Sequence, residues 1–195
     1  MSKVIALTGG IGSGKTYVAS IFYKLAGIPC FYSDIEAKKI MNENDYIKKE
    51  IVSILGPKSF INNKLNSEFL RNEIFSSQYK LKLINDLVHE EVGINFQKWL
   101  SFQTSKYILK ETAILFENKY HLDVDLSILV IAPENIRIER IIKRDSISEK
   151  QIKKIVENQW DDRKKLHLSD YFIENLNKPD TMKKVKELIK VFSSI

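Results

Sequence analysis

The hydrophobic positions along the chain form two kinds of pattern. Short continuous apolar runs such as Val4–Leu7 and Leu126–Ala132 have the length and composition of buried strands. Between them, apolar residues recur three and four positions apart, which is the spacing of one face of a helix. Buried strands that alternate with helices are typical of a parallel sheet covered on both faces. We therefore predict an α/β fold with a five-stranded parallel sheet flanked by helices.

The expected strands fall at residues 4–7, 28–32, 107–117, 126–132 and 171–173. Gly27 should end the first helix, because glycine readily adopts the left-handed backbone of a helix C-terminus. Pro133 should begin a helix after the fourth strand, and Ser148 should cap a further helix that runs to about Lys165. A terminal amphipathic helix, which includes Phe192, closes the chain.

The segment at about 35–106 has helical spacing throughout and no strand pattern. One apolar stripe lies at 47–55, before the helix-breaking pair at 56–57, and a longer stripe runs over 84–99. We interpret this segment as a helical insertion that packs on the ligand-binding edge of the sheet.

The strongest candidate for chemistry is the octapeptide after the first expected strand. It reads GGIGSGKT and meets the phosphate-binding pattern G-x-x-x-x-G-K-[ST]. The backbone N–H groups of such a loop form a nest for phosphate oxygens, Lys15 adds a charge for the β- and γ-phosphates, and the Thr16 hydroxyl is the expected Mg²⁺ ligand. A following helix also favours phosphate at its N-terminus. The expected nucleotide contacts are Gly9, Gly10, Ile11, Gly12, Ser13, Gly14, Lys15, Thr16 and the adjoining Tyr17.

Composition narrows the class of protein. The net charge of +6 and the pI near 9.2 come from lysines that are scattered among many acidic residues, so we expect solvated helix faces and no nucleic-acid partner. Cys30 is the only cysteine, which excludes an internal disulfide and a cysteine-based zinc cluster. Neither a signal-peptide core nor an 18-residue apolar run is present, and we therefore expect a cytoplasmic protein without a membrane partner.

Charged residues near the expected strand ends are further candidates. Arg140 and Arg144 are four residues apart and share a helix face after the fourth strand, where guanidinium groups could stabilise a transferring phosphoryl group. A surface pair that bridges nearby acids is the alternative. Asp34 follows the second strand and could act as a general base toward an attacking hydroxyl. It could instead cap the helix that begins near Ile35, or hold a magnesium-bound water.

Two other patterns lead elsewhere. Asn177–Asp180 matches the N-K-x-D guanine-recognition pattern of GTPases, but the chain contains no D-x-x-G switch motif, so we interpret the match as accidental. The three histidines, His89, His121 and His167, are too dispersed to predict a metal site.

Taken together, these residues resemble the dephospho-coenzyme A kinase family almost from end to end. The matching segments are the opening at 5–15, Ser33-Asp34, R-x-x-I-F at Arg71–Phe75, Leu-x-His at Leu87–His89, Leu-Phe-Glu at Leu115–Glu117, R-x-x-x-R-D at Arg140–Asp145, and Gln159, Asp170 and Asn175. The chain departs from the family at Tyr32, where an aspartate is usual, and at Glu90 and Ala113, where prolines are usual.

The resemblance implies a P-loop kinase that uses Mg²⁺ and transfers the γ-phosphate of ATP to the ribose 3′-hydroxyl of 3′-dephospho-coenzyme A. It implies Asp34 as base, with Lys15, Arg140 and Arg144 as catalytic cations. The substrate contacts that it implies are Asp34, Arg71, His89, Leu115, Phe116 and Glu117. We expect a core at 1–34, 107–133 and 166–195, the substrate-binding insertion at about 35–106, and a lid at about 134–165, in a monomer or weak homo-oligomer.

Two rival functions share the loop. A nucleoside or nucleotide kinase would differ only in what the helical insertion holds. A regulatory nucleotide-binding or nucleic-acid-binding protein would use the loop as a switch, and it would show no acceptor-dependent formation of ADP.

Overall fold

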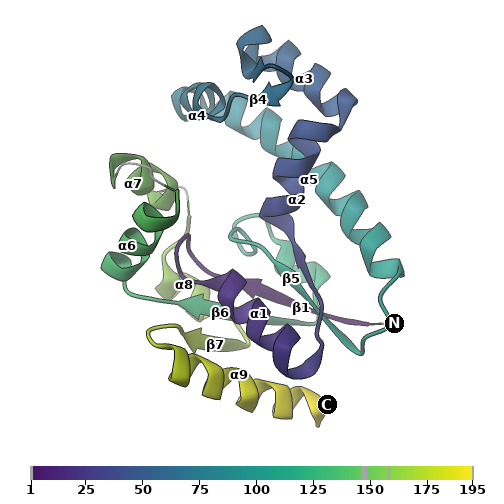
Figure 1. Cartoon of the computed structure of the whole chain (residues 1–195), viewed down its shortest axis with the longest axis vertical. Helices are drawn as coiled ribbons and strands as arrows, with labels where there is room; N and C mark the ends of the chain where they lie inside the picture. Colours follow the sequence, from purple (N-terminus) through teal and green to yellow (C-terminus); the bar gives the residue numbers. More distant parts are fainter. Residues whose placement is uncertain (1, 146–148, 158, 195) are drawn as a thin grey trace. The chain divides into compact units, whose positions relative to one another are not determined.

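The structure is a computed structural model that describes residues 2–145, 149–157 and 159–194. The chain divides into two compact units (Figure 1). The first, which we call the sheet unit, comprises Met1–Tyr32 and Gln103–Ile195. The second, the helical unit, comprises Ser33–Phe102.

The sheet unit is built on five parallel strands in the order β2-β5-β1-β6-β7. Their bounds are β1 Lys3–Thr8, β2 Cys30–Tyr32, β5 Tyr107–Glu111, β6 Leu126–Ile131 and β7 Tyr171–Glu174. The predicted five-stranded parallel sheet is confirmed. β1 lies at the centre, paired with β5 and β6, and its Ile5, Ala6 and Leu7 are completely buried. A strand covered on both faces needs apolar residues at every position, which explains its unbroken hydrophobic run.

Helices cover both faces of this sheet. The helical elements of the unit are α1 Lys15–Ala26, η2 Tyr120–Asp123, α6 Glu134–Asp145, α7 Glu149–Glu157, α8 Asp162–Leu166 and α9 Lys178–Ser193. α1 and α9 lie side by side in Figure 1, and their Phe22 and Phe192 pack with Ile5 and Leu7 in the main core. Ala6 points the other way and packs with Leu115 and Phe116. Gly27 ends α1 in the left-handed conformation, as predicted.

Two predicted elements have different limits in the structure. The third strand ends at Glu111 rather than at Glu117, because its last ladder bond runs from Thr112 N–H to Leu7 O and the chain then turns. The apolar residues after it are buried by packing and not by strand pairing. The helix expected to reach Lys165 is wrong: α7 ends at Glu157 and α8 begins at Asp162. The expected cap, Ser148, lies outside the described residues.

The new helix start at α8 has its own cap. The Asp161 carboxylate accepts a hydrogen bond of 2.7 Å from the Arg163 N–H, a standard way to satisfy a first-turn donor. This cap accounts for the start of α8 at Asp162, and Gln159 lies outside both helices.

The helical unit contains four α-helices, one short 3-10 helix and one small hairpin among its described residues. The bounds are α2 Ser33–Glu43, α3 Asp45–Leu55, η1 Pro57–Ser59, β3 Phe60–Ile61, β4 Lys64–Leu65, α4 Ser67–Ser76 and α5 Gln78–Ser101. The predicted stripes form its core, with Ile47 and Ile51 of α3 and Val88 and Phe96 of α5 buried. The expectation that this segment contains no strands is wrong.

The hairpin was missed because each of its strands has only two residues. Asn62 and Asn63 join them with φ angles of 49° and 63°, the left-handed conformation that a tight hairpin turn requires. Asparagine tolerates this conformation better than most residues.

Candidate active site

The octapeptide Gly9–Thr16 links β1 to α1 and folds tightly. Gly9, Gly12 and Gly14 have φ angles of 144°, 79° and 94°, which favour glycine. A side chain at these positions would also collide with other elements, because a Cβ on Gly9 would meet Val130 O of β6 and one on Gly12 would meet the backbone of α6. The glycines thus let the loop lie directly against its neighbours.

Lys15 is buried beside the loop that precedes it. Its Nζ donates a hydrogen bond of 3.0 Å to Gly9 O and lies 3.5 Å from Glu111 Oε1. Only 8% of the lysine and 6% of the glutamate side chain are exposed. The cation is therefore held at the loop by a carboxylate from the end of the adjacent strand.

Glu111 contacts Lys15 at the candidate site, and the sequence prediction missed it. The signal was present, because an acidic residue at the C-terminal end of a buried strand stands where open α/β sheets bind ligands. Extending the expected strand to Glu117 placed Glu111 in the middle of it and hid this signal. Thr16, in the first turn of α1, has an exposed side chain. Hydroxyl and carboxylate oxygens are ligands that Mg²⁺ prefers.

Arg140 of α6 reaches the other end of the loop. Its Nη2 donates to Asn175 O at 2.9 Å, and its Nη1 donates to Ser13 O at 3.4 Å. The Asn175 amide also donates to Ser13 O, at 2.8 Å. Of the two predicted arginines, Arg140 is thus brought to the loop, whereas Arg144 is exposed one turn farther along α6.

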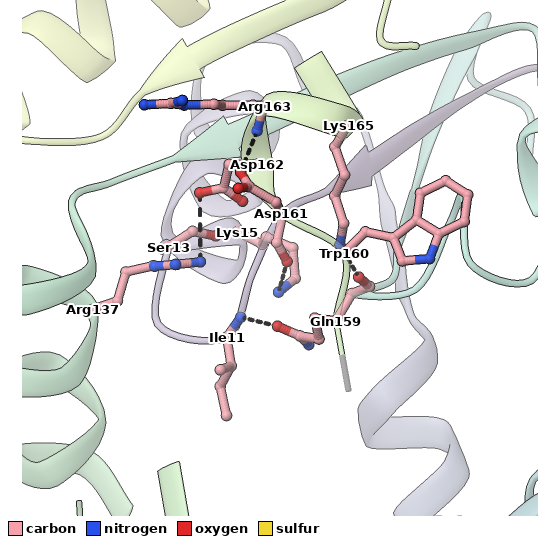
Figure 2. A network of polar contacts seen from close by, with 12 residues as sticks. Ile11, Ser13, Lys15, Arg137, Gln159, Trp160, Asp161, Asp162, Arg163 and Lys165 are labelled. Carbon is pink, nitrogen blue, oxygen red and sulfur yellow. Dashed lines mark hydrogen bonds and ion pairs between the residues drawn. The ribbon is translucent and has the colours of Figure 1, made fainter. Parts of the chain in front are cut away.

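A third arginine of α6, Arg137, lies over the start of the loop. Its Nη1 is 3.5 Å from Asp162 Oδ2, and a Cβ on Gly10 would collide with it. Gln159 reaches the same place: its Oε1 accepts a hydrogen bond of 2.9 Å from the Ile11 N–H (Figure 2). Arg137 was not among the expected site residues, although its spacing of three from Arg140 predicts a shared helix face.

Asp162 lies in a mixed electrostatic environment. Burial raises the pKa of its carboxyl, and so does the charge of Asp161. The positive charges of Arg137, Lys165 and Lys15 oppose that rise. The carboxylate is thus within electrostatic reach of two cations that face the loop.

The expected substrate contacts Leu115, Phe116 and Glu117 pack against, or bond to, other segments of the sheet unit. The two apolar side chains are completely or almost completely buried. Glu117 Oε1 accepts from the Trp160 N–H at 2.9 Å and lies 2.7 Å from Nζ of Lys165. Lys165 is itself fully buried and donates to Ala113 O. This ion pair joins the turn after β5 to α8.

The other expected site residues belong to the helical unit. Asp34 is exposed in the first turn of α2, which begins at Ser33, so it is not the residue before the helix and the capping alternative is wrong. Burial lowers the pKa of His89 on α5, and the charges of Asp86 and Asp34 oppose that shift. Arg71 of α4 is half-buried, and its Nε has no hydrogen-bond partner in the described part of the chain.

Tyr32 ends β2 at the position where a carboxylate was expected from the resemblance. Burial and the proximity of Cys30 and Glu111 raise the pKa of its phenol to about 12. The side chain is therefore uncharged at neutral pH and does not replace a carboxylate electrostatically.

The N-K-x-D match has a structural explanation. Asn177 precedes α9 and accepts a hydrogen bond of 3.0 Å from the Asp180 N–H, while its own amide donates to the Asp180 carboxylate at 2.6 Å. Asn177 thus caps the N-terminus of α9, and the Asp180 carboxylate holds its side chain in place.

Within the described residues, no helix has the length and apolarity to cross a membrane.

Known proteins with similar sequences share one name. The family model described as dephospho-CoA kinase matches residues 3–180. A dephospho-CoA kinase of Bacteroides fragilis is 33% identical over 190 residues, which is 97% of this chain and 92% of the relative. One of Aliivibrio fischeri is 34% identical over 179 residues, 91% of this chain and 98% of the relative.

Solved structures show the same fold. The dephospho-CoA kinase of Campylobacter jejuni aligns over 100% of this chain and 98% of its own, with a TM-score of 0.70 at 24% identity. The protein TT1252 of Thermus thermophilus aligns over 97% of both chains, with a TM-score of 0.86 at 23% identity. A shikimate kinase of Acinetobacter baumannii reaches a TM-score of 0.51 over 100% of this chain and 94% of its own, at 14% identity.

Proposed function

The chain belongs to the dephospho-CoA kinase family, and from this premise we propose how its residues divide the work of the reaction. The enzyme is an ATP-dependent phosphotransferase that phosphorylates the ribose 3′-hydroxyl of 3′-dephospho-CoA, giving CoA and ADP. Such a transfer passes through a loose transition state, so catalysis consists mainly of positioning and of charge stabilisation.

The observation that carries the proposal is the convergence of two cations on one loop. Lys15 comes from the start of α1 and Arg140 from α6, and both donate hydrogen bonds to backbone carbonyls of the loop. Their charges therefore flank the nest in which the phosphates of ATP would lie. In this proposal Lys15 binds the β- and γ-phosphates, and Arg140 stabilises the charge that develops on the transferring group. Arg144 lies farther along the same helix and assists when the lid, at about 134–165, closes.

Magnesium fits the oxygen atoms at the end of β5 and the start of α1. The Thr16 hydroxyl and the Glu111 carboxylate would hold the ion, and both residue types are usual at these places in P-loop proteins. Bound with ATP, the ion would supply positive charge that neutralises part of the negative charge of the phosphates. Glu111 also keeps Lys15 at the loop.

The helical unit is the part that binds the acceptor in this proposal. Asp34 acts as the general base toward the 3′-hydroxyl, and its carboxylate is exposed in the first turn of α2. Arg71 carries a buried, unused donor among the described residues, which suits a phosphate oxygen of the acceptor. His89 lies within electrostatic reach of Asp34.

One experiment tests the acceptor directly. The protein is incubated with Mg·ATP and, in separate reactions, 3′-dephospho-CoA, adenosine, AMP or buffer, and the products are identified by mass spectrometry. We expect one added phosphoryl group on 3′-dephospho-CoA, with a matching amount of ADP. Phosphorylation of adenosine or AMP instead would show a nucleoside or nucleotide kinase, and ADP formation without any acceptor dependence would reject the kinase assignment.

A further inference from the structure

Arg137 is placed as a phosphate-binding residue would be, although the match to the family's motif includes only Arg140 and Arg144 on this helix. The Arg137 side chain is only 12% exposed and lies against Gly10, so close that a Cβ on that glycine would collide with its Nη1. The Ile11 N–H, one of the donors of the nest, follows immediately. The Arg137 guanidinium and the Ile11 N–H thus both lie next to Gly10, at the start of the loop.

Arg137 can donate hydrogen bonds to a further partner. A guanidinium offers five N–H donors, and the contact with Asp162 is 3.5 Å long. Among the described residues, Arg137 Nε and Asp162 Oδ1 are both buried without a hydrogen-bond partner. Because buried polar groups are nearly always satisfied in folded proteins, these two groups suit a further polar partner beside the nucleotide loop.

The atoms that contact Arg137 and the Ile11 N–H in the structure are oxygens, and phosphate oxygens could replace them. Gln159 Oε1 accepts from the Ile11 N–H at 2.9 Å, and Asp162 supplies a carboxylate to Arg137 (Figure 2). Asp162 is also within electrostatic reach of Lys15. The connection between α7 and α8 therefore presents a carbonyl and an anion to the donors and cations of the loop.

We propose that Arg137 is a further ligand of the ATP phosphates and that Asp162 is its counterion in the empty enzyme. When nucleotide binds, the guanidinium exchanges its long contact with Asp162 for phosphate oxygens, and the Ile11 N–H exchanges Gln159 for the same ligand. No covalent bond changes in this exchange. The inference rests on the proposed function, because it assigns an additional residue to the same nucleotide site.

Two substitutions that each remove a charge separate this role from a structural one. The equilibrium dissociation constant of Mg·ATP is measured by calorimetry for Arg137→Gln and for Asp162→Asn, with the melting temperature of each variant. We expect Arg137→Gln to weaken ATP binding by about 10- to 100-fold, because it removes hydrogen bonds to a charged group. Asp162→Asn should tighten it by about two- to tenfold, because an anion that competes with the phosphates is neutralised.

Arg163→Gln is the matched control. It makes the same substitution as Arg137→Gln, but at an exposed position of α8, next to Asp162. It should leave the dissociation constant within about twofold, because exposed charges are well screened. If the pair served only to join α6 to α8, both Arg137→Gln and Asp162→Asn would weaken ATP binding and lower the melting temperature together. That result, or unchanged ATP binding in Arg137→Gln, would overturn the proposal.

Asp162→Asn keeps the test decisive if Arg137→Gln does not fold, because only the counterion role predicts tighter binding. The result is also independent of the acceptor. ATP binding is measured without 3′-dephospho-CoA, so a wild type that binds ATP but phosphorylates another acceptor would contradict the proposed function and leave the assignment of Arg137 standing.

Discussion

Lys15 has two partners in the structure, a carbonyl of its own loop and the buried Glu111 carboxylate. Its charge is therefore already in place before nucleotide binds. We expect Lys15→Ala to lower kcat by about 10²- to 10³-fold, because a preorganised charge facing the transferring group is lost. Steady-state ADP release measures the effect, and a melting temperature measured in parallel shows whether loss of the Lys15–Glu111 ion pair destabilises the fold. Activity within twofold of the wild type would exclude the phosphate role.

Asp34 differs from Lys15 in being exposed and in belonging to the helical unit. If it is the general base, Asp34→Asn should lower kcat by about 10²- to 10⁴-fold while ATP affinity stays near normal. Asparagine keeps the size of the side chain but does not accept the proton. The measurements are kcat with 3′-dephospho-CoA and the dissociation constant of Mg·ATP. A near-normal kcat would assign the reaction another base or none.

At the scale of elements, α6 is the helix that contacts the loop at both ends. Arg140→Ala should reduce kcat more than it weakens ATP binding, because the contact of the guanidinium with the transferring phosphoryl group strengthens in the transition state. Kinetics at saturating ATP, together with the dissociation constant, separate these two effects. Equal losses in both quantities would mean that Arg140 acts by binding ATP in its ground state.

The buried ion pair between Glu117 and Lys165 holds the turn after β5 to α8. Lys165→Met should lower the free energy of unfolding by about 3–5 kcal/mol, since it leaves the carboxylate buried with one fewer partner. Urea denaturation of the purified protein gives this value. Glu117 either stabilises the fold or contacts the substrate, and the KM for 3′-dephospho-CoA distinguishes these two roles. We expect Glu117→Gln to lower the free energy of unfolding and to leave that KM within about threefold, because no contact with the substrate is lost.

At the scale of the whole molecule, the two units should respond to different substrates. Hydrogen exchange followed by mass spectrometry should show slower exchange in β1, α1 and α6 when Mg·ATP is added. Adding 3′-dephospho-CoA alone should slow exchange in α2, α4 and α5 instead. A bound ligand opposes local opening of the segments that it contacts, by about 2.7 kcal/mol at 100 times its dissociation constant. Protection of the helical unit by ATP alone would contradict its assignment to the acceptor.

How far the sequence could predict these features depends on the range of the interactions involved. The strand Lys3–Thr8 and the loop after it are encoded by neighbouring residues, through an unbroken apolar run and closely spaced glycines, and both were predicted. The pairs Lys15–Glu111 and Arg137–Asp162 join residues that are distant in sequence, and no local pattern records them. The hairpin at Phe60–Leu65 was missed for the opposite reason. Its contacts are local, but its strands are too short to show a hydrophobic period.

The position of β1 at the centre of the sheet also has a consequence for synthesis of the protein. Its two neighbours, β5 and β6, end at Glu111 and Ile131, so β1 has no partner until about a hundred further residues have been synthesised. At ordinary translation rates this takes about 5 to 20 seconds. The helical unit is a compact unit of contiguous sequence, Ser33–Phe102, so its internal contacts can form during that interval. An apolar segment that waits this long is the part of the nascent chain in greatest need of a chaperone.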